Sequence, residues 1–463
     1  MQKQLAVPGP PPPPVFGAFG TKVQFYRDPL GRMLSLYRDY GTLVRPGGPG
    51  GMVFAFGPEH NQRLLSDTTL FYNPDLQRIC PEGTSLHRLW TGLVNMNGDR
   101  HKQNRRRMMP AFQRKRVEGY QGLMHEVIER STAHWKAGEV RDLSHEMMLL
   151  TLRVVTRALF GLDDFDEMDR VGGLLKQWLG LYASAPVHLF PRDVPLTPFR
   201  TLLRLSEQVE EVIRDIIARR RRLGPGQDVL SVLMSATDEE GGSLSEQELF
   251  GHIALLYVAG HETSANALTW TFFLLEQHPE VLANVVDELQ SVLQGQLPTA
   301  ESLPKLPLLD RVIKESLRLL PPTPFSSRRG MAPFELGGVE FPTGTEVRYS
   351  PFVTHRMPEL YAQPNRFLPS RWETLEPQPY AYIPFAGGPR MCIGYSFAMQ
   401  EIGLTLASLL PRFRFERVPG HRVDRKVLAS FSPKHGLPMV LHAQDRAFRR
   451  TPLEGDVGEL LDL

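Results

Sequence analysis

Residues 385–394 read Phe-Ala-Gly-Gly-Pro-Arg-Met-Cys-Ile-Gly, and this stretch decides which fold the chain is expected to adopt. It contains Cys392, one of two cysteines in 463 residues. A helical pattern begins near Ser396, and the free N–H groups of a helix N-terminus lower the pKa of a nearby thiol. Gly388 and Gly394 permit tight turns and a close approach of the backbone to a bound group. These surroundings favour a thiolate at Cys392, whereas the alternative is an ordinary buried thiol.

The motif F-x-x-G-x-R-x-C-x-G in this stretch resembles the haem-thiolate loop of the cytochrome P450 family. The resemblance implies that Cys392 is the axial ligand of the iron of haem b, where a thiolate favours O–O cleavage. It also implies that Phe385 shields the sulfur and that Arg390 binds a haem propionate. Cys80 has no comparable surroundings, and we interpret it as a small hydrophobic residue.

A long apolar segment, residues 245–277, is expected to form one helix that begins at a serine cap with a glutamate three residues later. A helix of about 30 residues is roughly 45 Å long, which is enough to cross a domain. His252 and Asn266 lie in this segment, and polar groups at such positions argue against a membrane span. The segment is therefore predicted to be a buried core helix that carries a site.

The middle of this segment reads Ala-Gly-His-Glu-Thr from Ala259 to Thr263 and resembles the oxygen-activation motif of the same family. The resemblance implies that Gly260 leaves room for dioxygen and substrate. Thr263 is expected to donate a hydrogen bond to the carbonyl of Ala259, and Glu262 to relay the protons that O–O cleavage requires. Alone, the motif fits equally well a helix kink with a surface glutamate. His261 is interpreted as structural.

Glu315 and Arg318 are three residues apart in a helix predicted over residues 310–320, so they share a face and can pair. Such pairs are common, but residues 367–372 also resemble the family's F-x-P-x-R segment. The resemblance implies that Arg371 joins the pair in a buried network. We assign this network to folding and haem retention, because removal of one buried partner typically costs about 3–5 kcal/mol.

The two haem propionates require cationic partners. The resemblance implies that His101 and Arg105, four residues apart on one helix face, are two of them and that Arg328 is another. The basic run at residues 105–107 has two open interpretations. It is either a solvated basic face or a docking surface for an acidic electron donor.

The substrate pocket is only partly predicted. Leu255, Ala259 and Thr263 repeat at helical spacing on a face expected to look onto the haem. The predicted pocket residues, each of which could also be ordinary core, are Leu93, Leu255, Ala259, Thr263, Thr323 and Phe325. They indicate an apolar substrate that is bound mainly by burial. The sequence of the haem loop favours a fatty acid as the substrate, and terpenoids, steroids and polyketides remain alternative substrate classes.

The composition indicates a cytoplasmic protein, and we expect it to be a monomer. A net charge of +2 is too small to indicate nucleic-acid binding, and two cysteines cannot form a disulfide framework. The N-terminus has no long apolar stretch, so we expect neither a signal peptide nor a membrane anchor. The fold class is expected to be mostly α with small β-sheets (α+β). Strand-like segments are few, namely 51–56, 334–340, 346–349 and 437–442.

The resemblance implies the cytochrome P450 fold, a triangular helical prism with haem between a long central helix and the cysteine loop. We expect a proline-rich lead-in at residues 1–20, a single catalytic domain at residues 21–445 and a C-terminal tail at residues 446–463.

The expected function is that of a haem-thiolate monooxygenase, which hydroxylates a C–H bond or epoxidises a C=C bond with one atom of O₂. No flavin or iron–sulfur module follows the haem loop, so NAD(P)H-derived electrons should arrive through a separate ferredoxin or flavodoxin and its reductase. Two alternatives stay open. One is a peroxide-driven peroxygenase or isomerase, against which Glu262 and Thr263 argue, and the other is a non-catalytic haem-binding protein.

Overall fold

The computed structural model describes residues 7–14, 17–48, 51–237 and 242–463. The chain divides into two compact units. The sheet unit consists of the described residues up to Pro74, together with Lys314–Cys392 and Val457–Leu463. The helical unit consists of Asp75–Ile313 and Ile393–Asp456.

The expected lead-in at residues 1–20 falls partly outside the described residues, at 1–6 and 15–16. Its last residues belong to a helix, α1, which begins at Gly17. The division into lead-in, single catalytic domain and tail stays a prediction.

The sheet unit contains a five-stranded sheet with the strand order β1-β2-β8-β5-β3. Its strands are β1 (Leu43–Val44), β2 (Val53–Ala55), β3 (Phe71–Tyr72), β5 (Ser326–Gly330) and β8 (Glu346–Tyr349). β2 and β8 are parallel, with Ala55 opposite Tyr349, and the other neighbours are antiparallel. Val53, Phe71 and Val347 are buried in one cluster with apolar residues of α3 (Pro58–Ser66), and this cluster is the core of the unit.

A hairpin of β6 (Phe334–Leu336) and β7 (Val339–Phe341) projects from the same unit. The prediction of a single strand over residues 334–340 is wrong. Gly337 and Gly338 have φ angles of 59° and 74°, and two consecutive residues with positive φ reverse the chain in a tight hairpin turn. The strands predicted at 51–56 and 346–349 are confirmed as β2 and β8.

Short helices complete the sheet unit: α1 (Gly17–Arg27), α2 (Pro29–Tyr40), α16 (Pro351–Thr354), and the 3₁₀ turns η2 (Pro369–Glu373), η3 (Gly388–Arg390) and most of η4 (Asp456–Leu460). The helix predicted at 310–320 is α15 (Pro307–Leu319), whose last residues, from Lys314, belong to this unit. Pro321 and Pro322 follow it and prevent its continuation.

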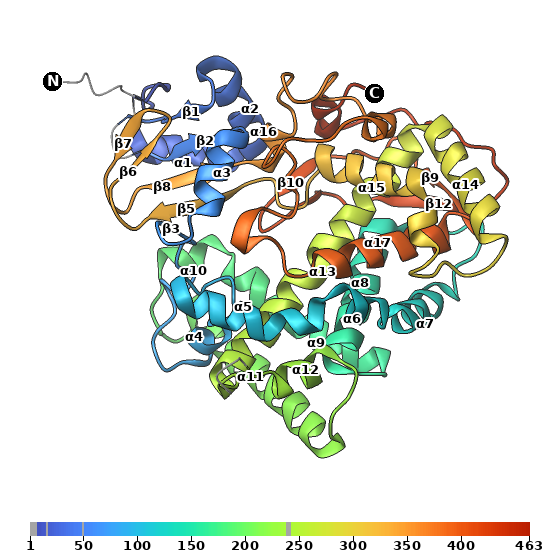
Figure 1. Ribbon diagram of the computed structural model, residues 1–463, viewed down its shortest axis with the longest axis horizontal. Helices are drawn as coiled ribbons and strands as arrows, with labels where there is room; N and C mark the ends of the chain where they lie inside the picture. Colours follow the sequence, from blue (N-terminus) through green and yellow to red (C-terminus); the bar gives the residue numbers. More distant parts are fainter. Residues whose placement is uncertain (1–6, 15–16, 49–50, 238–241) are drawn as a thin grey trace. The chain divides into compact units, whose positions relative to one another are not determined.

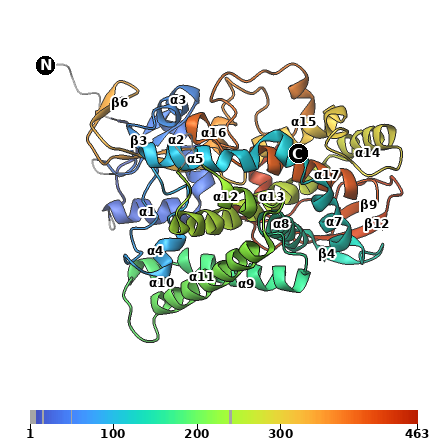
Figure 2. The same cartoon turned by 60° about the horizontal axis from the view of Figure 1, so that its bottom comes forward.

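The helical unit contains most of the long helices (Figures 1 and 2). The helices of this unit, long and short, are α4 (Ser85–Leu89), α5 (Gly98–Phe112), α6 (Arg114–Glu118), α7 (Gln121–Thr132), α8 (Leu143–Phe160), α9 (Phe165–Tyr182), α10 (Ala185–Leu189), α11 (Pro198–Leu223), α12 (Val229–Ser235), α13 (Glu246–Gln277), α14 (Pro279–Leu293), the 3₁₀ turn η1 (Leu303–Lys305) and α17 (Tyr395–Leu409). One antiparallel sheet has the order β4 (Val140–Asp142), β12 (Pro438–Ala443) and β9 (Phe413–Arg417), and β10 (Arg425–Val427) pairs with β11 (Phe431–Pro433) in a hairpin.

The helix α13 organises this unit, because α4, α8, α11 and α17 all pack against it. Its start is fixed by a capping box, in which Ser245 accepts a hydrogen bond from the Glu248 N–H and the Glu248 side chain accepts one from the Ser245 N–H. The predicted span of residues 245–277 is therefore confirmed.

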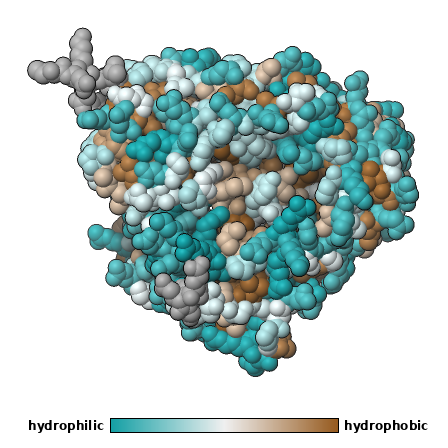
Figure 3. Space-filling model, viewed as in Figure 1, coloured by the Kyte–Doolittle hydropathy of each residue, from teal (hydrophilic) through white to brown (hydrophobic). Residues whose placement is uncertain are grey.

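Hydrophilic residues cover most of the face shown in Figure 3, with apolar residues scattered among them. Among the helices that the structure describes, none is both long enough and apolar enough to cross a membrane.

Candidate functional site

The predicted cysteine loop is a compact turn at the end of the sheet unit. The Cys392 N–H donates to the Phe385 carbonyl over 2.9 Å, and the Met391 N–H donates to the Gly388 carbonyl over 3.0 Å. These two bonds tie the loop into a closed shape that presents the Cys392 side chain at the surface of the described chain. The helix α17 begins three residues later, at Tyr395, so the predicted position of the cysteine just before a helix is confirmed.

The backbone conformation requires glycine at one of the two predicted loop positions, Gly388, but not at the other, Gly394. Gly388 has a φ angle of 65°, and a Cβ atom there would come within 2.5 Å of the carbonyl oxygen of Leu65, at the end of α3. Any side chain would therefore push the loop away from α3. Gly394 has a φ angle of −85°, which other residues adopt readily, so a tight turn does not explain it.

The Glu315 carboxylate lies at the centre of a buried network in the sheet unit. Its oxygens accept hydrogen bonds from Arg318 Nε (2.8 Å), Arg371 Nε (2.9 Å) and Trp372 Nε1 (2.9 Å). Burial alone would raise the pKa of Glu315, but the hydrogen bond and the charge of Arg318, helped by Arg371, lower it below its usual value. The structure thus joins the three predicted residues and adds Trp372, which the sequence pattern did not indicate.

Two predicted propionate partners also belong to the sheet unit. Arg328, on β5, is buried, donates to the Ser327 carbonyl over 2.9 Å and lies over the Tyr349 ring. Arg390 is half-buried in η3. Of the predicted pocket residues in this unit, Phe325 packs its ring against Phe25.

One more predicted pocket residue and the two other predicted propionate partners differ in their exposure to solvent. Thr323 of the sheet unit is exposed. His101 and Arg105 lie one turn apart on α5 of the helical unit. His101 is buried and Arg105 is half-buried. Arg106, the next residue of the basic run, is exposed, so this part of α5 presents positive charge to solvent.

The middle of α13 has an open face, although the rest of the helix is buried almost all round. Three residues spaced four apart line it: Leu255 and Thr263 are half-buried, and Ala259 is exposed. The Thr263 hydroxyl donates to the Ala259 carbonyl over 2.9 Å, which confirms the predicted bond. An open, partly apolar stripe in the middle of a buried helix is the surface that a flat apolar group and its substrate need.

Two neighbours in the motif face away from this stripe. A Cβ atom on Gly260 would lie 3.1 Å from Val155 Cγ2, so the missing side chain makes room for α8. His261 is buried, and its Nδ1 lies 2.7 Å from the Tyr257 carbonyl while its own carbonyl accepts a bond from Thr151. The structural interpretation of His261 is confirmed.

Leu93 is buried in the segment before α5. This segment approaches α13 very closely, because a Cβ atom on Gly92 would lie 2.3 Å from the Gly251 carbonyl oxygen. Thr91 also donates to the Gln247 carbonyl over 3.1 Å. The segment that carries Leu93 is therefore fixed against the first half of α13.

Two further residues of the helical unit bear on the site. Ser430, just before β11, donates a hydrogen bond to the Glu262 carboxylate. Glu401, on α17, is completely buried, and burial raises its pKa to about 8, against a small opposing effect of the Ser264 hydroxyl. No local pattern in the sequence indicates that Ser430 contacts Glu262.

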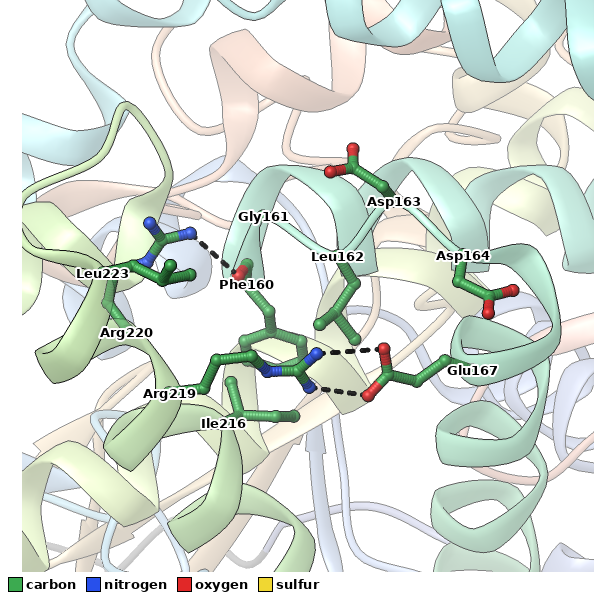
Figure 4. Close-up of a pocket in the computed structure, with 10 residues that line it drawn as sticks. All are labelled: Phe160, Gly161, Leu162, Asp163, Asp164, Glu167, Ile216, Arg219, Arg220 and Leu223. Carbon is green, nitrogen blue, oxygen red and sulfur yellow. Dashed lines mark hydrogen bonds and ion pairs between the residues drawn. The ribbon is translucent and has the colours of Figure 1, made fainter.

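A separate cavity of about 250 Å³ lies where the end of α11 meets the turn between α8 and α9 (Figure 4). Arg219 pairs with Glu167 across it over 2.6 Å, and Arg220 donates to the Phe160 carbonyl. The residues predicted for the site are not among those that line it. The other ion pairs of its charged residues are made outside the lining, by Arg220 with Asp228 and by Asp163 with Arg157.

The comparisons with known proteins agree on one family. Residues 8–436 match the family model described as cytochrome P450. The chain is 36% identical over 419 residues to cyclooctatin synthase of Streptomyces melanosporofaciens, which covers 87% of this chain and 89% of that protein. It is 34% identical over 425 residues to pentalenene oxygenase of Streptomyces avermitilis, with 89% and 92% covered.

Solved structures show the same fold. A retinoic-acid-bound cyanobacterial CYP120A1 superimposes with a TM-score of 0.81 at 27% identity and covers 96% of this chain and 100% of its own. A cytochrome P450DA heme domain does so with a TM-score of 0.84 at 25% identity, covering 97% and 100%. The chain therefore belongs to the cytochrome P450 family, and the expectation of a mostly helical fold with small sheets is confirmed.

Membership makes the protein an oxidoreductase, a monooxygenase whose family uses haem b, O₂ and NAD(P)H-derived electrons delivered by a partner. The residues present fit this cofactor. Cys392 offers an accessible thiol on a closed loop, α13 offers a partly apolar open face, and each unit carries cationic side chains suited to propionates.

Proposed function

We propose that this monooxygenase hydroxylates or epoxidises an apolar terpenoid and receives its electrons from a separate ferredoxin or flavodoxin with its reductase. The observation that carries the proposal is the open face of α13, on which Leu255 and Ala259 provide an apolar surface beside the hydroxyl of Thr263. A hydrocarbon substrate offers few groups that can form hydrogen bonds. It must therefore be bound mainly by burial of its apolar surface, which contributes a free energy of about 25 cal/mol per Å².

The terpenoid class is favoured over the fatty acid that the haem-loop spelling suggested. Cyclooctatin synthase, cyclooctat-9-en-7-ol 5-monooxygenase and pentalenene oxygenase, three relatives of 32–36% identity, carry the names of terpenoids. A rigid polycyclic hydrocarbon loses little conformational freedom on binding, so an apolar pocket without polar anchors suits it better than a flexible chain.

In this proposal the sheet unit supplies the ligand and two propionate partners. Cys392 would coordinate the haem iron, with Phe385 shielding the sulfur and Gly388 holding the loop against α3. Arg328 and Arg390 would bind propionate oxygens as charge-assisted donors. When it is bound, the haem supplies the activation of O₂, which the thiolate ligand promotes.

The helical unit would supply the proton pathway and the remaining cations. His101 and Arg105 would bind propionate from α5, an i,i+4 pair on one face. Thr263 would hold a proton beside the reacting oxygen, and Glu262 would take protons from water and pass them on. The bond from Thr263 to the Ala259 carbonyl supports this role, because it fixes the hydroxyl on the open face of α13.

The electron donor would dock on the basic surface of α5 and on a neighbouring groove. The groove, with a volume of about 490 Å³, is lined by residues of α6, the start of α15 and the first turns of α17, among them Arg114 and Tyr395. Exposed Arg106 adds positive charge on α5, and charge steering speeds the association of acidic partners. A monomeric, cytoplasmic enzyme stays part of the proposal.

The test is a titration of the purified holoenzyme with polycyclic terpene hydrocarbons, matched fatty acids and steroids, followed by the shift of the haem absorption band. We expect saturable shifts with terpenes and weaker or no shifts with fatty acids. Saturable shifts with fatty acids alone would overturn the substrate class. Turnover with hydrogen peroxide but none with a reductase, a ferredoxin and NAD(P)H would instead favour a peroxygenase.

A further inference from the structure

The buried hydroxyl of Ser430 lies between two residues of α13, the half-buried Glu262 and the buried Asn266. The hydroxyl donates to Glu262 Oε1 and accepts a hydrogen bond from Asn266 Nδ2 over 2.8 Å. Ser430 and Asn266 are 4% and 1% exposed, so water has little access to the hydrogen bond between them. The bonds form a directed chain from the Asn266 amide through the hydroxyl to the carboxylate, because a hydroxyl has a single proton to donate.

Ser430 is the hydrogen-bond donor to the Glu262 carboxylate. The Ser430 hydroxyl is therefore the contact that fixes the orientation of the carboxylate. A hydrogen bond to a charged group is strong enough to favour one rotamer of the Glu262 side chain and weak enough for the carboxylate to leave it.

Ser430 itself is placed by the hairpin of β10 and β11, which is fastened along one face of α13. Glu262, Asn266 and Trp270 are spaced four residues apart on that face. Trp270 Nε1 donates to the Phe431 carbonyl over 2.9 Å, and the two rings lie 5.0 Å apart. The hairpin therefore packs along α13 from Trp270 to Glu262, the acid next to Thr263.

We propose that Ser430 is a positioning residue that holds Glu262 in the orientation from which it exchanges protons with Thr263 and with solvent. The inference rests on the proposed role of Glu262 in proton delivery. A proton taken from water by Glu262 passes towards Thr263 and leaves the carboxylate ready for the next one, while Ser430 keeps its own proton throughout.

The test compares Ser430→Ala with Ser430→Thr, which keeps the hydroxyl, and with Ser432→Ala, which removes a hydroxyl from the same hairpin two residues away. In Ser430→Ala we expect the share of NAD(P)H consumed that ends as hydrogen peroxide to rise several-fold, with unchanged haem content and substrate-binding constant. Ser430→Thr should restore coupling, and Ser432→Ala should match the wild type.

A second measurement does not depend on turnover. The carboxylate stretching band of Glu262, identified by its loss in Glu262→Gln, should shift in Ser430→Ala because the carboxylate loses a donor. Glu262→Gln combined with Ser430→Ala should be no more uncoupled than Glu262→Gln alone. If Ser430→Ala fails to take up haem, Ser430→Cys, which has a weak donor of similar size, serves the same comparison.

The outcomes separate the two claims. If Glu262→Gln leaves coupling unchanged, the proposed role of Glu262 fails, and this inference fails with it. If Glu262→Gln uncouples the reaction while Ser430→Ala changes neither the coupling nor the carboxylate band, only the inference about Ser430 is overturned.

Discussion

The carboxylate of Glu315 and the guanidinium of Arg318 are both completely buried and are joined by two hydrogen bonds, of 2.8 and 2.9 Å. Arg318 also donates to three backbone carbonyls, those of His355, Pro364 and Arg366. Every charge in this pair is therefore matched by close partners. Such a pair resists the removal of one member, because the other would remain as an uncompensated buried charge.

Truncation of Arg371, the second cation on Glu315, is expected to destabilise the protein. Arg371→Ala should lower the free energy of unfolding by about 3–5 kcal/mol, measured by chemical denaturation, and should lower the haem content of purified protein. Arg366→Ala is the matched control, since its side chain is exposed and should change stability by less than about 0.5 kcal/mol. Equal effects of the two substitutions would show that the network has no special role.

Thr263 is expected to act through its hydroxyl on the open face of α13. Thr263→Val keeps the volume of the side chain but removes the donor, so we expect more hydrogen peroxide per NAD(P)H consumed with little change in substrate binding. Thr269→Val is a matched control. The Thr269 hydroxyl makes the same bond four residues back, to Ala265 over 2.7 Å, but it is completely buried. Unchanged coupling in Thr263→Val would contradict proton delivery at this residue.

The buried acid Glu401 is expected to make stability depend on pH. Its pKa is raised by burial to about 8 in the folded protein, and its ordinary value in the unfolded chain is 4.5. The folded state therefore keeps a proton that the unfolded chain loses, so the contribution is full below pH 4.5 and is lost as pH rises to about 8. No charged neighbour contributes to this shift, and Ser264 of α13 is the polar group that opposes it.

Glu401→Gln mimics the protonated acid at every pH and should remove this dependence. Between pH 4.5 and 8 the variant should gain about 4 kcal/mol of stability relative to the wild type, measured by urea denaturation at several pH values. Parallel stability curves for the two proteins would mean that Glu401 is already ionised in the folded state.

Local signals in the sequence predicted much of the fold. The span of α13 was predicted to within one residue, because both of its signals, a capping box and a continuous apolar run, are formed by residues close together in the sequence. The hairpin at Gly337 and Gly338 was missed because its apolar residues also fit a single strand. Two adjacent glycines were the available signal.

The site was predictable only where a motif is contiguous. The cysteine loop and the Glu262–Thr263 pair are short local patterns, whereas Ser430 reaches Glu262 across 168 positions of sequence. A serine in a polar hairpin gives no sign of such a contact before the chain folds. The packing reason for Gly260, which faces Val155, also depends on a second helix and lies beyond any local pattern.

A bond from the Cys392 sulfur to haem iron underlies every role proposed for the site. The reduced carbon-monoxide spectrum of the purified holoenzyme tests it. We predict that the wild type and Cys80→Ala show the long-wavelength Soret band of a thiolate-ligated haem and that Cys392→Ala lacks it. The same band in Cys392→Ala as in the wild type would contradict the assignment.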